Sequence, residues 1–108
     1  MSGYVYLLCD SSKNNTYKIG ATRGNIEKRI KKLQTGNSGE IYLCKYYKTE
    51  YPFFIESYLH KSLKFKKILN EWFELDDDYA NNFINECLKI ENLIKLMEDN
   101  PFFPKKLK

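Results

Sequence analysis

Two short apolar runs separated by a polar cluster constrain the fold of this chain more than any other feature. The first run spans Gly3 to Cys9, and the second spans Thr16 to Ala21. Polar turn residues between two β-favouring runs predict an antiparallel hairpin. A turn centred near Ser12 places Tyr6 opposite Lys18, and residues that lie opposite each other share one face of a sheet. The alternate residues of both strands then point to the other face and toward a core.

The rest of the chain predicts one further strand, a short extended segment and helices. Asn25 is a suitable N-cap for a helix over 26–34, and a β-favouring run over 41–47 predicts a third strand. A second helix is predicted from after Pro52 to about residue 67, followed by an extended segment at 71–75. A long helix then starts at three aspartates, 76–78, and runs to about residue 99.

These elements predict a mixed α/β (α+β) fold in which helices pack on a three-stranded antiparallel sheet. The length of 108 residues is that of one domain, which we place at residues 1–100, with a basic C-terminal tail at 101–108. Hydrophobic residues make up 43% of the chain and aromatic residues 16%, which favours a folded globule over a disordered segment.

The charge distribution favours a polyanionic partner. The net charge is +4, and residues 1–50 carry nine Lys or Arg against four acids, so the basic excess lies in the first half. A basic half favours contacts with phosphates, because such contacts release counterions. A solubilising surface would explain the same charge.

Cysteine usage and hydropathy indicate the compartment. Cys9, Cys44 and Cys87 are odd in number and widely spaced in apolar segments, so we expect reduced, buried thiols in a reducing compartment. A single histidine and the lack of a Cys-x-x-Cys pair argue against structural zinc. The sequence has neither a stretch long enough to span a membrane nor a signal-peptide pattern. We therefore expect a soluble, intracellular protein of the cytoplasm or nucleus, with no membrane partner.

Four groups within the first 56 residues of the chain suit the hydrolysis of a phosphodiester bond. They are the Tyr6 hydroxyl, the Lys18 amine, the Arg29 guanidinium and the Glu56 carboxylate. In this order the chain resembles the GIY-YIG nuclease superfamily. It is most similar to a branch from phages, large DNA viruses and some fungi, described as a DNA-binding domain related to a meiotically up-regulated gene product.

Three short stretches and two departures define this resemblance. The branch shows Tyr-Lys-Ile-Gly, Leu-Gln-Thr-Gly-Asn and Glu-Trp-Phe stretches, which here are Tyr17–Gly20, Leu33–Asn37 and Glu71–Phe73. The first glycine of the family motif would fall at Tyr4, one residue after the Gly3 of this chain. The tyrosine of the second tripeptide aligns with Lys18, and Tyr17 points to the opposite face of the strand.

The resemblance implies a divalent-metal-dependent DNA endonuclease, a hydrolase of phosphodiester bonds. Glu56 would hold one Mg²⁺ or Mn²⁺ ion whose other positions are filled mostly by water. Tyr6 would act as general base or orient the attacking water, and the amine of Lys18 would favour its phenolate. Arg29 would clamp the phosphate with its planar fork. His60, four residues after Glu56, would donate a proton or support Glu56.

Each of these residues also has an ordinary structural interpretation. Glu56 could pair with a lysine on a helix surface, and Tyr6 could simply pack in its strand. Lys18 and Arg29 could be solvated, and His60 could be a buried, hydrogen-bonded histidine. The chain could accordingly be a catalytically weak or inactive DNA-binding module of the same fold. A more distant alternative is a protein-interaction domain with an aromatic surface.

Lysines outside this group predict how DNA is held. The expected phosphate contacts are Lys31, Lys32, Lys45 and Lys48. Such contacts make the affinity depend on salt without specifying sequence. The chain contains no zinc finger, helix-turn-helix or basic zipper, so we expect sequence preference to be weak, structure-based or supplied by a partner. Because a domain of this size covers one phosphate, cutting both strands requires a homodimer on the substrate or two sequential nicks.

Overall fold

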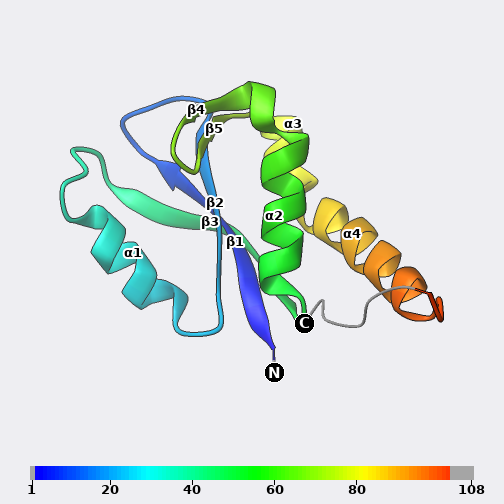
Figure 1. The fold of residues 1–108 in the computed structure, drawn as a ribbon. Coiled ribbons are helices and arrows are strands. Elements are labelled where there is room, and N and C mark those ends of the chain that lie inside the picture. Colours follow the sequence, from blue (N-terminus) through cyan, green and yellow to red (C-terminus); the bar gives the residue numbers. More distant parts are fainter. Residues whose placement is uncertain (1, 103–108) are drawn as a thin grey trace.

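The computed structural model describes residues 2–102 and forms an antiparallel sheet with helices on both faces (Figure 1). The strands are β1 (Gly3–Asp10), β2 (Thr16–Thr22), β3 (Ile41–Thr49), β4 (Lys67–Leu69) and β5 (Trp72–Glu74). The helices are α1 (Ile26–Gln34), α2 (Pro52–Ser62), α3 (Asp77–Asn81) and α4 (Phe83–Glu98), with a 3₁₀ turn, η1, at Lys64–Lys66. The strands are ordered β3-β1-β2-β5-β4 across the sheet.

The α+β class is confirmed, but the sheet has five strands and not three. The difference arises after α2, which was expected to continue to about residue 67 and ends at Ser62. Its buried stripe of Ile55, Leu59 and Leu63 has lysines at the next helical positions, so a longer helix would gain no apolar contact. The chain instead forms the hairpin β4–β5, which turns at Asn70 with a left-handed φ of 55°.

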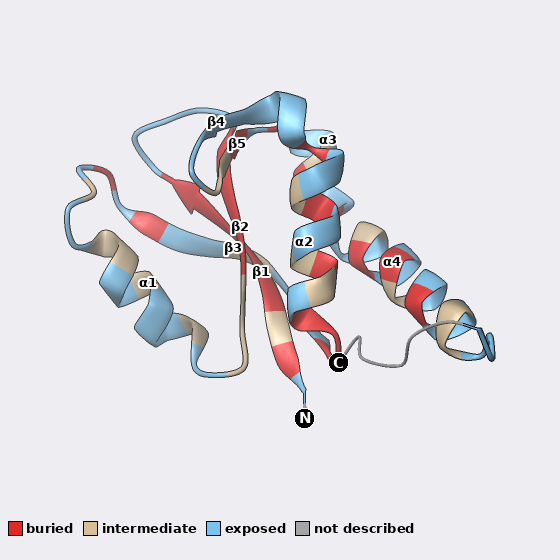
Figure 2. Cartoon of the chain, in the orientation of Figure 1, coloured by how far each residue is buried: buried red, intermediate tan, exposed pale blue. Residues whose placement is uncertain are grey.

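The two sheet faces carry separate cores. Helices α2 and α4 cover the face that contains Val5, Leu7 and Ile19, whereas α1 covers the face that contains Tyr6 and Leu8. Figure 2 shows the buried positions concentrated along β1 and β2, between these helices. Every residue of β1 except Tyr4 is buried, and both faces of this strand are therefore in contact with core.

The hairpin register differs from the prediction by two residues. Tyr6 lies opposite Gly20, and Lys18 lies opposite Leu8. The turn is therefore centred at Lys13 and not at Ser12. Because side chains alternate with a period of two, this shift leaves Tyr6 and Lys18 on the same face. The expected pairing was wrong, but the shared face that depends on it is confirmed.

A buried carboxylate fixes the turn of this hairpin. The Asp10 side chain accepts hydrogen bonds from the Ser12 backbone (2.9 Å), the Ser12 hydroxyl (2.6 Å) and the Asn37 amide (3.0 Å). A Cβ atom at Gly39 would collide with this carboxylate, so the loop after α1 approaches Asp10 at a distance that only glycine permits. The contact ties the end of β1 to the segment that leads into β3.

The pairing of β1 with β3 places two cysteines differently from the expectation. Tyr42 lies opposite Cys9, and Cys44, two residues further along β3, projects from the same face. Cys44 and Cys9 form a disulfide. The prediction of three reduced thiols was wrong for this pair, because the wide spacing of the cysteines in the sequence does not reveal which strands are neighbours. Cys87 is free and buried, as expected.

Helix α4 is fastened to the sheet by hydroxyl–carboxylate contacts. Glu91 accepts hydrogen bonds from the Tyr47 hydroxyl (2.8 Å) and from Thr49, and Glu98 accepts one from the Tyr51 hydroxyl (2.6 Å). The predicted long C-terminal helix is divided at Asn82 into α3 and α4. Residues 103–108 of the predicted tail lie outside the described residues. Within residues 2–102, none of the helices combines the length and apolarity needed to traverse a bilayer.

Candidate functional site

The site forms where strand β2 runs past the end of its neighbour. Strand β5 pairs with β2 only at residues 16–18, and the edge of β2 then meets side chains of α2. The His60 ring bonds through Nε2 to the Ile19 carbonyl at 2.8 Å, and the Glu56 carboxylate accepts from the backbone N–H of Ala21. Glu56 and His60 lie one helical turn apart, so both reach the same strand edge.

Tyr6 approaches this edge from the other side of β2. Its side chain is fully buried, and its ring lies directly over Gly20. A Cβ atom at position 20 would lie 2.5 Å from the ring Cζ and the hydroxyl, so Gly20 provides the space for the ring. Among the described residues, the Tyr6 hydroxyl is the only buried side-chain polar atom without a hydrogen-bond partner. Such a group is costly to bury, which marks the position as a site for a ligand or water.

Arg29 supplies the positive charge that faces this hydroxyl. Helix α1 is capped by Asn25, whose side chain accepts from the Lys28 backbone at 3.2 Å, and it packs Ile26, Ile30 and Leu33 on the sheet. Burial raises the pKa of Tyr6 above its ordinary value of 10.0, and the Arg29 guanidinium opposes this rise. The pKa of Arg29 is in turn raised, mainly by its interaction with Tyr6.

Lys18 is held differently from the expectation. Its amine is buried and pairs with the Glu71 carboxylate at 2.8 Å, and it lies 5.7 Å from the centre of the Trp72 ring. The cation that opposes the rise in the Tyr6 pKa is therefore Arg29. Glu71 was not identified as a site residue from the sequence, although it begins the Glu-Trp-Phe stretch. The hairpin β4–β5 brings it to the site, and that hairpin was not predicted.

Glu56, His60 and Glu71 have a geometry suited to a divalent cation. Their ligand atoms all lie within 4.8 Å of one another. Burial raises the pKa of Glu56, the charge of Glu71 raises it further, and His60 and Lys18 oppose the shift. Because the Ile19 carbonyl can only accept, His60 Nε2 donates, which leaves Nδ1 as the nitrogen available for a metal. Two carboxylates and an imidazole fit Mn²⁺, and the carboxylates alone fit Mg²⁺ with waters.

The comparison with known families identifies the chain. The family model of the T5orf172 domain matches residues 3–97. The chain belongs to the T5orf172 domain family. This family is phage-associated and of the DNA-binding or nuclease-like kind, which agrees with the broad function expected and assigns no catalytic mechanism. No curated protein and no solved structure gives a significant match.

The family assignment corrects the resemblance drawn from the short stretches. The T5orf172 domain is a different family from GIY-YIG. The stretches that suggested GIY-YIG are three to five residues long, and short motifs also fit turns and strand ends in unrelated chains. The T5orf172 match extends over most of the chain and is therefore decisive.

The T5orf172 domain gathers the five predicted site residues but disperses the predicted DNA-binding lysines. Tyr6, Arg29, Lys18, Glu56 and His60 are linked by contacts or mutual charge effects, with Glu71 among them. By contrast, Lys31 and Lys32 are exposed on α1, and strand alternation places Lys45 and Lys48 on opposite faces of β3. These four lysines do not form one continuous surface.

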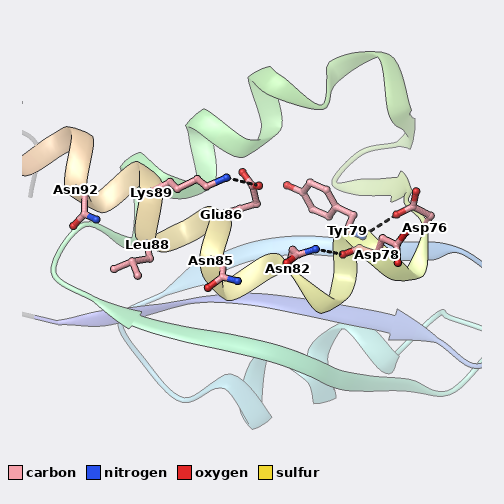
Figure 3. A pocket seen from close by; sticks show the side chains of 9 residues that line it. All are labelled: Asp76, Asp78, Tyr79, Asn82, Asn85, Glu86, Leu88, Lys89 and Asn92. Carbon is pink, nitrogen blue, oxygen red and sulfur yellow. Dashed lines mark hydrogen bonds and ion pairs between the residues drawn. The ribbon is translucent and has the colours of Figure 1, made fainter.

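A hollow elsewhere in the domain shares no residue with the site. It lies along α3 and α4, and Figure 3 shows its polar lining. Its charged groups are in part neutralised among themselves, as in the ion pair of Lys89 with Glu86 at 3.6 Å. The site around Tyr6 is distinguished by its buried, unpaired and clustered polar groups, and not by a large cavity.

Proposed function

We propose that this T5orf172 domain is a divalent-metal-dependent endonuclease that hydrolyses DNA phosphodiester bonds at the strand edge between Tyr6 and Glu56. One observation carries the proposal: the Tyr6 hydroxyl is buried without a hydrogen bond of ordinary geometry among the described residues, and the charges of Arg29, Glu71 and Glu56 all act on it. A folded protein retains such a costly group where function uses it.

In this proposal each side chain has a separate role in the hydrolysis of the phosphodiester bond. Arg29 is exposed on α1, and its fork binds two phosphate oxygens at once. Tyr6 hydrogen-bonds the attacking water and accepts its proton, to the extent that Arg29 stabilises the phenolate. Glu56 and Glu71 would hold the metal, with His60 as a third ligand, because the ligand atoms of the three residues lie within 4.8 Å of one another. When bound, Mg²⁺ or Mn²⁺ supplies positive charge that stabilises the phosphate and the leaving oxygen.

Lys18 acts by positioning, and His60 has a positioning role in addition to its role as a metal ligand. Lys18 fixes the Glu71 carboxylate through the 2.8 Å ion pair. His60 anchors the end of α2 to the Ile19 carbonyl and thereby holds Glu56, one turn earlier, against β2. These contacts keep both carboxylates at the edge where the phosphate would lie. The partner in this proposal is DNA, and a double-strand cut would use two copies or two successive nicks.

A second candidate function is DNA binding without efficient cleavage. It is favoured by the raised pKa of Tyr6, which opposes its use as a base, and by the engagement of Lys18 with Glu71. Both candidates predict salt-dependent DNA binding. Only the endonuclease requires a metal and Glu56.

Conversion of supercoiled plasmid to nicked or linear DNA tests the proposal. Purified protein is assayed in Mg²⁺ and in Mn²⁺, with EDTA and the Glu56→Gln variant in parallel. Glu86→Gln is the matched control, because this glutamate lies on α4 in an exposed pair with Lys89. We expect cleavage by the wild type and by Glu86→Gln, and none with EDTA or Glu56→Gln. Plasmid that is bound but left intact under all conditions would favour the binding module.

A further inference from the structure

A basic and apolar segment lies between α2 and β5, outside the groups assigned to catalysis. Residues 61–69 contain four lysines and no acidic residue, and all four lysines are exposed: Lys61, Lys64, Lys66 and Lys67. The same segment exposes large apolar side chains, with Phe65 at 91%, Leu69 at 66% and Ile68 at 55% of their surface. Folding alone does not explain so much exposed apolar surface on a strongly charged segment. We refer to residues 64–69 as the basic hairpin surface.

The basic hairpin surface lies next to the candidate site. It follows the C-terminal end of α2, the helix that carries Glu56 and His60, and it leads through Asn70 into Glu71. Strand β4 is one of the two outer strands of the sheet, and within residues 2–102 its pairing partner is β5. Figure 1 shows η1 and β4 above the end of α2, beside β5. A substrate bound at the strand edge could therefore extend over this surface.

The positive charge of the surface favours a phosphate-bearing partner over a second copy of the chain. A second copy that docked against this surface would bring two segments of four lysines and no acidic residue together, and this like-charge contact is unfavourable. Phosphates neutralise these lysines, and bases can cover the apolar side chains. Lys64 Nζ lies 5.0 Å from the centre of the Phe65 ring, so one position offers both an ammonium group and an aromatic face. Phe65 also borders a hollow lined by Glu74, Asp76 and Lys66, where the two carboxylates disfavour a phosphate backbone and Lys66 in part offsets their charge.

We propose that the basic hairpin surface binds the DNA substrate beside the cleavage site, with Phe65 stacking on an unpaired base. The inference rests on the proposed function and narrows its substrate to DNA that contains unpaired or single-stranded positions near the scissile phosphate. The lysines contact phosphates on the same strand. An exposed ring can stack only on a base that has left the duplex, which is the reason for the preference.

Fluorescence anisotropy with two labelled DNAs tests this inference. One DNA is a fully paired duplex, and the other has the same sequence with a short unpaired segment. Binding is measured in EDTA over a series of salt concentrations. The variants are Phe65→Ala and the triple change of Lys64, Lys66 and Lys67 to Gln. The control is the double change Lys89→Gln and Lys95→Gln, exposed lysines on α4 that lie close to glutamates. Thermal unfolding verifies that every variant folds.

We expect the two hairpin variants to lose DNA affinity in different ways. Phe65→Ala should weaken binding to the unpaired DNA by about 5- to 100-fold, as loss of one stacked base does, and leave the paired duplex unchanged. The triple variant should bind both DNAs more weakly and lower the salt slope by about 0.7–0.9 per lysine lost. The α4 control should match the wild type.

The outcomes separate this inference from the proposed function. If the wild type binds and cleaves DNA and the hairpin variants bind it equally well, the inference is wrong and the proposed function stands. If the wild type binds neither DNA, both are wrong. Binding of the hairpin to anionic lipid vesicles, or pairing of two copies through β4, in place of DNA binding would also overturn the inference.

Discussion

Replacement of Tyr6 by phenylalanine should make the protein more stable and inactive at the same time. The Tyr6 hydroxyl is buried and has no hydrogen-bond partner among the described residues. An unsatisfied buried polar group costs about 1–3 kcal/mol, and the nearby Arg29 guanidinium offsets part of that cost. We therefore expect Tyr6→Phe to raise the free energy of unfolding by about 1 kcal/mol, which corresponds to about 4–8 °C in Tm for a domain of this size.

Tyr51→Phe is the matched control for this prediction. The Tyr51 hydroxyl donates to Glu98 at 2.6 Å, so its removal should lower the free energy of unfolding, by about 1 kcal/mol. Chemical denaturation of both variants measures the two effects, and plasmid cleavage measures activity. If Tyr6→Phe is destabilised as much as Tyr51→Phe, the Tyr6 hydroxyl is satisfied in the folded protein. A satisfied hydroxyl would not be free to bind a substrate, and the role of Tyr6 proposed above would be refuted.

Three further predictions concern the space that Gly20 leaves for the Tyr6 ring, the hairpin turn at Asp10 and the metal ligands. Gly20→Ala should destabilise the fold by about 1–3 kcal/mol and reduce cleavage, because the added Cβ meets the Tyr6 ring at 2.5 Å. Gly24→Ala, whose nearest contact would be 3.6 Å, should do neither, and equal effects in denaturation would contradict the account. Hydrogen bonds from Ser12 and Asn37 lower the pKa of Asp10 below 3.8, so its stabilising effect should be complete above that pH and disappear as the pH falls through the lowered value. The difference in unfolding free energy between wild type and Asp10→Asn should therefore shrink on acidification, and a constant difference would show that Asp10 does not titrate in this way. Glu71→Gln should weaken Mn²⁺ binding by about tenfold or more in calorimetry without DNA, and unchanged affinity would remove Glu71 from the ligand set.

The parts of the site that the sequence predicted depend on local periodicity. Tyr6 and Lys18 share a face because strand side chains alternate, and the two-residue error in register did not change that face. Glu56 and His60 lie together because they are one helical turn apart. Arg29 borders the stripe of α1 that packs on the sheet. Each of these relations needs only the type of the element and not its exact partner.

The parts that were missed depend on contacts between distant segments. Glu71 reaches Lys18 only because the chain reverses at Asn70 and forms β4, where the amphipathic pattern of α2 had predicted more helix. Cys9 meets Cys44 because β1 and β3 are neighbours in the sheet, a pairing that the spacing of the cysteines in the sequence does not reveal. The basic hairpin surface was also missed, because the charge of residues 51–108 as a whole is slightly negative and conceals the four lysines of 61–69.

The most direct test of the endonuclease is to measure binding and cleavage on one labelled DNA. Affinity is determined in EDTA, and the single-turnover rate is determined in Mg²⁺ or Mn²⁺, for wild type and Glu56→Gln. Our account predicts affinities that agree within about twofold and a cleavage rate that falls by at least about a hundredfold in the variant. A variant that cuts as fast as the wild type, or a wild-type rate that does not depend on the metal, would contradict it.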